Sequence, residues 1–310
     1  MRKVIMFFLL MLCRGYVFSQ SDMMFSQTAF NPAFVNPGYA GSDTSNYYNV
    51  IAMSRILTSG LEKAPNVTIL NVNGPLHIGS AKGGVSFSFC NDQSGFLSTP
   101  AFNLGYAYKT RLGKGSLGLG LSAGVFFSTL ESEGWVLPDG NTDPLIPTGK
   151  NSKQSFDLGL GLYYAGDRFY AGLSVTHLVR PTMVQGDNAV RVPRNYYLMA
   201  GYRLALDNPD IEIRPSALML TDLGTFGFSM NALLFYRNKL WAGLDYRIKN
   251  SLALVAGMNI LPDLRLGYSY GYNTALLSRF SGGNHEIMLT YKFFVYINRE
   301  KLKYKSIRYL

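Results

Sequence analysis

The segment Phe102-Asn103-Leu104-Gly105-Tyr106-Ala107-Tyr108-Lys109 alternates apolar residues with small or polar ones. Successive side chains of a β-strand point to opposite faces, so this pattern predicts a strand with one apolar face and one face of small or charged residues. Leu240-Trp241-Ala242-Gly243-Leu244-Asp245-Tyr246-Arg247 has the same alternation, and similar segments of roughly ten residues recur from Tyr47 to Phe294. The repeat predicts an all-β fold, either a soluble sandwich or a transmembrane β-barrel.

Residues 1–19 have the three parts of a secretory signal peptide. Met1-Arg2-Lys3 is positively charged, the stretch 4–12 is apolar but too short to span a bilayer, and Val17-Phe18-Ser19 offers a cleavage site before Gln20. Cys13 raises the alternative of a lipoprotein, but the large residues before it disfavour lipid attachment. We therefore expect the chain to be exported past the inner membrane.

The composition favours a barrel over a helical membrane protein. Hydrophobic residues make up 47% of the chain and charged residues 15%, and after the signal no apolar run reaches the ~20 residues that a membrane-spanning helix needs. A barrel places apolar residues only on its lipid face, so its average composition is close to that of a soluble protein. We predict a transmembrane antiparallel β-barrel in the outer membrane.

Clusters of Gly, Pro, Asn and Asp divide the region 47–294 into fourteen candidate strands. An even number returns both ends of an antiparallel barrel to the periplasm, as is usual for bacterial barrels. The predicted strands are Tyr47–Arg55, Asn66–Val72, Gly83–Asn91, Thr99–Lys109, Ser116–Phe127, Phe156–Tyr164, Phe169–His177, Asn195–Leu204, Ile213–Leu220, Phe228–Tyr236, Leu240–Arg247, Leu252–Ile260, Leu264–Tyr272 and Glu286–Phe294.

Two patterns predict how the barrel is oriented. The long connections Leu130–Gln154, Leu178–Arg194 and Asn273–His285 follow odd-numbered strands and should lie outside the cell, with the short Lys249-Asn250 connection as an exception. Five descending strands end in an outward-facing aromatic residue, which predicts an aromatic girdle at one rim. These residues are Tyr108, Tyr164, Tyr202, Tyr236 and Phe293.

The inner face of the predicted barrel is rich in glycine and carries a few charges. Glycine lets a sheet bend into a closed barrel, and it also leaves space inside, so we expect both effects and a hollow lumen unless a segment plugs it. The predicted lumen glycines are Gly118, Gly120, Gly124, Gly159, Gly161, Gly172, Gly201, Gly243, Gly257 and Gly267. The predicted lumen charges are Asp157, Arg203, Asp245, Arg247, Arg265 and Lys292.

The segment 20–46 precedes the first strand and contains two Asn-Pro steps, at Asn31-Pro32 and Asn36-Pro37. A residue before proline is pushed out of the helical region, so the segment is not one continuous helix. Its aromatic residues Phe25, Phe30, Phe34 and Tyr39 are of the kind that dominate interfaces. The segment is therefore either a plug at the lower rim or a strap that binds a periplasmic partner, and both alternatives stay open here.

The residues 295–310 form a basic tail, in which Arg299, Lys301, Lys303, Lys305 and Arg308 outweigh Glu300. Anionic lipid or an acidic periplasmic partner would suit such a tail, and so would a solvated tail with no specific role. Nucleic acid is not an expected partner of an exported protein.

A search for catalytic groups gives no enzyme motif. His77 and His177 are predicted at opposite rims of the barrel, too far apart to act together, and no metal-ligand spacing is present. The glycine-rich stretch 79–84 lacks the spacing of a phosphate-binding loop. We predict that the protein is not an enzyme and has no cofactor and no metal site.

The chain resembles the PorP/SprF outer-membrane proteins of the type IX secretion system, which occur in gliding and related bacteria. The resemblance lies in the Phe25-Ser26-Gln27, Phe30-Asn31-Pro32 and Asn36-Pro37-x-Tyr39-Ala40-Gly41 series, together with Asn73-Gly74-Pro75-Leu76, Gly105-Tyr106-Ala107-Tyr108, Gly118–Gly124, Asp157–Tyr164, Tyr170–Ser174 and His285–Phe293. It covers nearly the whole chain after the signal.

The resemblance implies a barrel that helps to export and anchor particular secreted proteins with a C-terminal sorting domain, such as gliding adhesins. It also implies cooperation with the type IX translocon and with periplasmic lipoproteins. The chain departs from the family at Ile56–Gly60, where members often have Trp-x-Gly, and in its tail, since members usually stop near Phe293. The alternative function is a passive porin or hydrophobic-solute channel.

Overall fold

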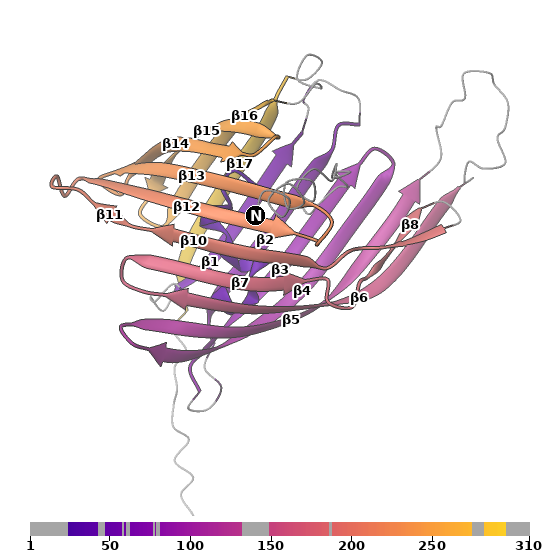
Figure 1. The fold of residues 1–310 in the computed structure, drawn as a ribbon, viewed down its shortest axis with the longest axis horizontal. Coiled ribbons are helices and arrows are strands. Elements are labelled where there is room, and N and C mark those ends of the chain that lie inside the picture. Colours follow the sequence, from indigo (N-terminus) through magenta and orange to yellow (C-terminus); the bar gives the residue numbers. More distant parts are fainter. Residues whose placement is uncertain are drawn as a thin grey trace, which may run out of the picture.

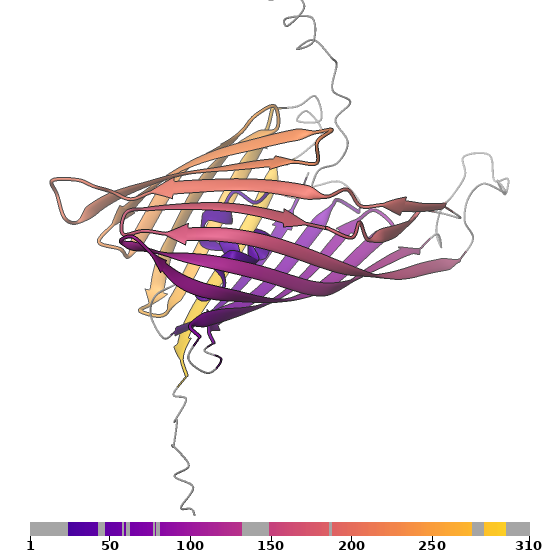
Figure 2. The same cartoon turned by 60° about the horizontal axis from the view of Figure 1, so that its bottom comes forward.

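The computed structural model describes residues 24–42, 47–57, 59, 63–76, 78, 81–131, 149–185, 188–274 and 282–295. The predicted signal peptide at 1–19, most of the basic tail, His77 and most of the longest connection lie outside the described residues. The described part of the chain forms a closed antiparallel barrel of fourteen strands (Figures 1 and 2).

The barrel strands follow one another around the wall in chain order, each paired with its neighbour. They are β1 (Tyr47–Ile56), β2 (Asn66–Pro75), β3 (Gly83–Ser94), β4 (Leu97–Leu112), β5 (Gly115–Glu131), β6 (Lys150–Ala165), β7 (Phe169–Thr176), β10 (Asn195–Tyr202), β12 (Ile211–Thr221), β13 (Phe226–Tyr236), β14 (Leu240–Arg247), β15 (Ser251–Leu261), β16 (Leu264–Asn273) and β17 (Asn284–Phe294). The ring closes where β1 pairs with β17, from Tyr47 opposite Phe294 to Ile56 opposite His285. The predicted fold and number of barrel strands are confirmed.

Two short strands were not predicted: β8 (Thr182–Gln185) pairs with β9 (Asn188–Arg191) in a separate two-stranded sheet. The predicted strand Asn195–Leu204 is divided at Arg203 into β10 and β11 (Leu204–Ala205), which both pair with β12. The ladder of β5 and β6 also runs further than predicted, to Glu131 opposite Lys150. Apart from Leu130 the extra residues are polar, so the apolar alternation that predicts a membrane strand does not reach them.

Alternation along each strand separates the inner face from the outer one, as β15 illustrates. Ser251, Ala253 and Val255 are buried, whereas Leu252 and Leu254 point outward, the latter with 63% of its surface exposed. Large apolar side chains are exposed in this way around the whole wall, as expected of a surface that faces lipid. No helix in the described residues combines the length and apolarity that crossing a membrane would require.

The two ends of the barrel differ. We call the end where β1 finishes and β17 begins the loop end, and the opposite one the turn end. The strands on either side of the long connections 132–149, 177–194 and 274–283 have their joined ends at the loop end, but the same end also has the tight turn Gly95-Phe96, which the sequence did not predict as an exception. Tyr108, Tyr202 and Tyr236 are exposed close to the turn end of their strands. Which end faces the periplasm stays a prediction.

Residues 24–42, here called the strap, lie inside the barrel (Figure 2). The strap consists of the short helices η1 (Thr28–Phe30), α2 (Pro32–Val35) and η2 (Pro37–Tyr39). It is interrupted at Asn31 and Asn36, whose backbones leave the helical region before each proline. The predicted absence of a continuous helix is therefore confirmed.

Candidate functional site

The strap is held near the loop end by the carboxylate of Glu286 on β17. The backbone N–H of Ser26 donates to both carboxylate oxygens, at 2.8 and 3.1 Å. Arg247 donates from Nη2 to the Ser26 hydroxyl at 2.7 Å, and Asn231 donates to the Ser26 carbonyl at 3.1 Å. Ser26 thus has its amide, carbonyl and hydroxyl groups satisfied by three different strands.

Glu286 belongs to a buried cluster of four charges. Arg55 on β1 lies 3.3 Å from its carboxylate, and these two residues are direct cross-strand partners at the seam that closes the barrel. Arg247 lies 3.3 Å from Glu286 and 3.2 Å from Asp245. All four side chains are at most 5% exposed, and the two positive charges balance the two negative ones. Such balance is needed because an unpaired charge in this environment is strongly unfavourable.

The aromatic residues of the strap pack into the barrel interior. Phe30 lies against Trp241 and Phe235, with ring centroids 5.3 and 6.4 Å apart. Phe25 is part of the same buried apolar cluster, and Phe34 packs against this cluster and a second one that includes residues of β6, β10 and β12. These contacts remove apolar surface from water.

The second anchor of the strap is the turn Asn36-Pro37-Gly38, which lies directly against glycines of the wall. A Cβ atom added at Gly120 would be 2.2 Å from the Gly38 nitrogen, and one at Gly118 would be 2.1 Å from the Gly38 oxygen. Neither distance is sterically allowed, so both positions need glycine while the strap is in place. The glycines form a flat surface on which a backbone turn can rest.

Polar groups fix this turn in position. The Asn36 amide donates to the carbonyls of Leu162 and Leu173 on neighbouring strands, at 2.9 and 3.3 Å, and its oxygen accepts from Gly38 N–H. Lys109 donates from Nζ to the carbonyl of Gly38 at 3.0 Å. Asn36 is fully buried and therefore links the strap to the hydrogen-bonding groups of two wall strands.

The predicted lumen glycines do lie on the inner wall, but the space they leave is occupied. Gly118, Gly120 and Gly161 face the strap turn, whereas Gly257 lies beneath the ring of Trp241 and Gly267 beneath the Gln27 amide. The lumen was expected to be hollow unless a segment fills it, and on this side of the barrel the strap occupies the space. Small residues here allow close contact with the strap and with large rings.

The predicted lumen charges separate into two groups. Asp157, Asp245 and Arg247 are buried on the inner wall. Arg203 follows the end of β10 and forms an ion pair with Glu212, with 56% of its side chain exposed, while Arg265 and Lys292 are half-buried near the turn end. Sequence analysis missed Arg55 and Glu286, because single charges on strands that far apart in the chain give no local signal.

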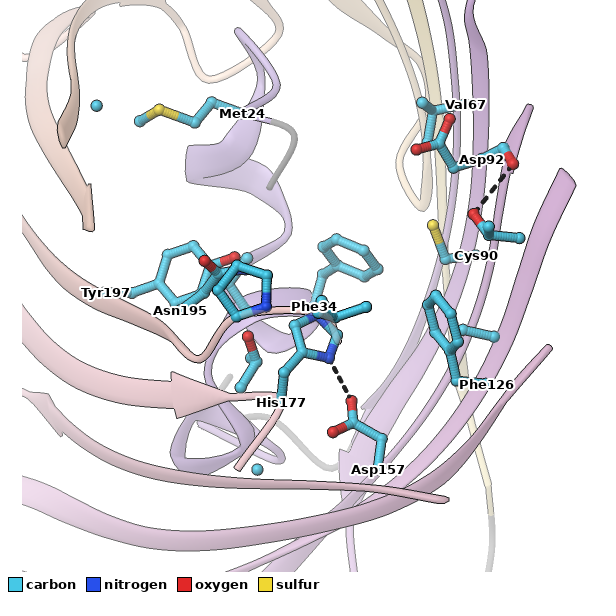
Figure 3. Close-up of a pocket in the computed structure, with 18 of the residues that line it drawn as sticks. Met24, Phe34, Val67, Cys90, Asp92, Phe126, Asp157, His177, Asn195 and Tyr197 are labelled. Carbon is cyan, nitrogen blue, oxygen red and sulfur yellow. Dashed lines mark hydrogen bonds and ion pairs between the residues drawn. The ribbon is translucent and has the colours of Figure 1, made fainter. Parts of the chain in front are cut away.

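A cavity of about 1900 Å³ remains on the loop side of the strap (Figure 3). The apolar part of the lining includes Met24, Phe34 and Tyr197. The polar part includes Asp157 and His177, which are hydrogen-bonded to each other at 2.7 Å. In the described residues, no lining comes from β15, β16 or β17, none from β4 beyond Gly105 and none from β5 before Ser122. The cavity therefore lies mainly toward the loop end of the barrel.

The described residues contain no group of three or more His, Cys, Asp or Glu side chains able to hold a metal. His285 contacts Tyr268 and Tyr270 on the outer wall, away from His177.

Comparison with known families matches residues 17–291 to the family described as type IX secretion system membrane protein PorP/SprF. The chain belongs to the PorP/SprF family. This PorP/SprF protein is accordingly an outer-membrane barrel of the type IX secretion system. Comparison with curated protein sequences gives no match.

Several solved structures are similar to this PorP/SprF protein in fold. The outer membrane protein Omp33 of Acinetobacter baumannii is 9% identical, with 80% of this chain and 97% of that chain covered and a TM-score of 0.47. The translocator domain of autotransporter NalP from Neisseria meningitidis is 12% identical, with 87% and 96% covered and a TM-score of 0.48. The CymD monoaromatic hydrocarbon channel is 12% identical, with 90% and 95% covered and a TM-score of 0.46.

Replacing Glu286 by Gln should strongly destabilise this PorP/SprF protein. The substitution leaves Arg55 and Arg247 buried with one carboxylate between them, which costs about 3–5 kcal/mol. The free energy of unfolding by urea in detergent micelles measures the effect. The control is Glu131→Gln, whose ion pair with Lys150 is largely exposed and should matter little. Equal stability of the two variants would contradict the role given to Glu286.

Replacing Gly120 by Ala should loosen the strap, because the new methyl group meets the backbone of Pro37 and Gly38. Overpacking of this kind costs about 1–3 kcal/mol. The matched control is Gly227→Ala on the same inner face, where the nearest atom is the sulfur of the flexible Met24 side chain at 3.1 Å. Unfolding in micelles and protease cleavage within the strap should both distinguish the variants; identical behaviour would show that the strap does not rest on the glycine wall.

Proposed function

We propose that this barrel assists the export and surface anchoring of specific secreted proteins that carry a C-terminal sorting domain, such as gliding adhesins. Family membership supports a role in type IX secretion, and the barrel fold supports a place in the outer membrane. The observation that carries the specific proposal is the cavity of about 1900 Å³ at the loop end, closed from below by the strap. A cavity of this size, with the strap along its turn side, suits holding a polypeptide more than passing a solute.

The proposed orientation places the turn end in the periplasm and the loop end outside the cell. In its support, β17 finishes at Phe294 on the turn end, and the strand ends joined by the long connections lie at the opposite end. The type IX translocon and periplasmic lipoproteins are the proposed partners on the turn side. Met24 lies in the lumen toward the loop end, where Arg55 donates a hydrogen bond to its carbonyl. The periplasmic position of the amino terminus stays a prediction.

Partner binding by the N-terminal motif is proposed for the residues that reach the cavity. Phe25, Phe34 and Pro37 line it, so they can contact a bound segment. The remaining motif residues hold the strap in place through the contacts described above or through burial in the wall. They are Phe30, Asn31, Pro32, Asn36 and Tyr39.

Deletion of the gene should leave a particular secreted protein inside the cell. Quantitative proteomics of the cell surface, compared between the deletion strain and the wild type, measures this directly. We expect one or a few proteins with a C-terminal sorting domain to disappear from the surface and to return on complementation. An unchanged set of surface proteins would contradict the proposed role.

The same strains separate this proposal from a passive channel. Under that alternative the purified barrel conducts ions steadily in a planar bilayer, and the deletion changes solute uptake while the surface proteins stay the same. The strap, pinned to the wall at Ser26 and at Asn36, favours low conductance.

A further inference from the structure

The hairpin of β8 and β9 borders the loop-end cavity and is only partly incorporated into the barrel. On its β8 side it is attached to the wall: Val184 N–H donates to the Ser128 hydroxyl at 3.0 Å, and Thr182 N–H donates to the Ser155 hydroxyl at 3.1 Å. β9 pairs with β8 alone among the strands of the described residues. Its second edge is therefore without a strand neighbour in that part of the chain.

The direction of the β9 backbone groups follows from one hydrogen bond. Val192 N–H donates to the Pro181 carbonyl at 2.8 Å, toward the β8 side. Backbone groups alternate in direction along a strand, so the N–H groups of Ala189 and Arg191 point away from β8. Open strand edges of this kind pair readily with another extended chain, and this pairing is a common mode of peptide recognition.

The open edge lies at the cavity. Val190, Arg191 and Val192 all belong to the cavity lining, and Val190 is 45% exposed although it is apolar. The cavity volume of about 1900 Å³ is well above the range of about 300–1,000 Å³ that is typical of small-molecule sites. Size and edge together indicate a polypeptide segment as the occupant.

A second feature of the lining points to the same occupant. Leu223, in the turn between β12 and β13, lines the cavity with 80% of its surface exposed and with a φ of +70°. The left-handed backbone region is unfavourable for leucine, and at this position the apolar side chain of Leu223 is also kept out of the core. Asp222 accepts hydrogen bonds from Gly224 and Thr225, which keeps the turn in this shape. The turn therefore presents Leu223 to whatever fills the cavity.

We propose that the loop-end cavity receives an extended polypeptide segment, which adds to the hairpin as a third strand beside β9 and packs an apolar side chain against Leu223. This inference rests on the proposed function, because the segment is taken to belong to the exported protein. Backbone pairing supplies affinity that does not depend on sequence, and alternate side chains supply the specificity.

The test uses substitutions at Arg191 in the full-length protein. Arg191→Pro removes the outward N–H while sparing the groups that bond to β8, and proline is tolerated at such edge positions. Arg191→Ala removes the same charge but keeps the N–H, and is the matched control. The probe is the C-terminal domain of the secreted protein that the deletion strain fails to display, bound to purified barrel in detergent. We expect the Pro variant to bind about tenfold more weakly than the Ala variant, because only the Pro variant lacks the N–H.

Leu223→Asn provides a second variant that does not touch the hairpin. Asparagine tolerates the left-handed region, so the barrel should resist unfolding at least as well as the wild type while the probe binds less tightly. Normal binding by both Arg191→Pro and Leu223→Asn would overturn the inference and leave the proposed function intact. A deletion strain that displays every surface protein would instead overturn the proposed function, so the two failures are distinguishable.

Discussion

The carboxylate of Glu286 is the group on which the interior of this barrel depends. It stands opposite Arg55 across the β1–β17 seam and also binds the backbone of Ser26 in the strap. Burying a carboxylate is unfavourable unless cations and hydrogen-bond donors replace its water, and here two guanidinium groups and an amide do so. Closure of the barrel and retention of the strap are consequently coupled through one side chain. Ser26, which precedes the first barrel strand, thus contacts the last one, β17.

The wall on the opposite side meets the strap by shape instead of charge. Gly118, Gly120 and Gly161 leave a surface on which the Asn36-Pro37-Gly38 turn rests at van der Waals distance, and the Asn36 amide bonds to wall carbonyls. The strap is thus fixed at two points, one electrostatic and one steric. Between them it divides the lumen and leaves the cavity toward the loop end.

The sequence predicted the wall well and the interior poorly, for physical reasons. Alternation is a local pattern, so each strand could be recognised from its own residues, and their number was correct. The breaks of the strap at Asn31 and Asn36 were also local, because proline restricts the residue before it. The position of the strap depends instead on Arg55, Arg247 and Glu286, which come from three strands and meet only when the barrel closes. The glycines were placed on the correct face of the wall. Their contact with the strap turn could not be predicted, because no local sequence pattern shows that the turn packs against them. The hairpin of β8 and β9 was missed because its strands are short and lie within a predicted loop.

Hydrogen–deuterium exchange of the strap tests the central claim most directly. In the folded protein in lipid nanodiscs, peptides that cover residues 24–36 should exchange as slowly as those from β1 and β17, because Ser26 and its neighbours bond to the buried wall. In the Glu286→Gln variant the same peptides should exchange faster than the barrel strands. Strap peptides that exchange at the rate of an unstructured chain in the unaltered protein would contradict the account.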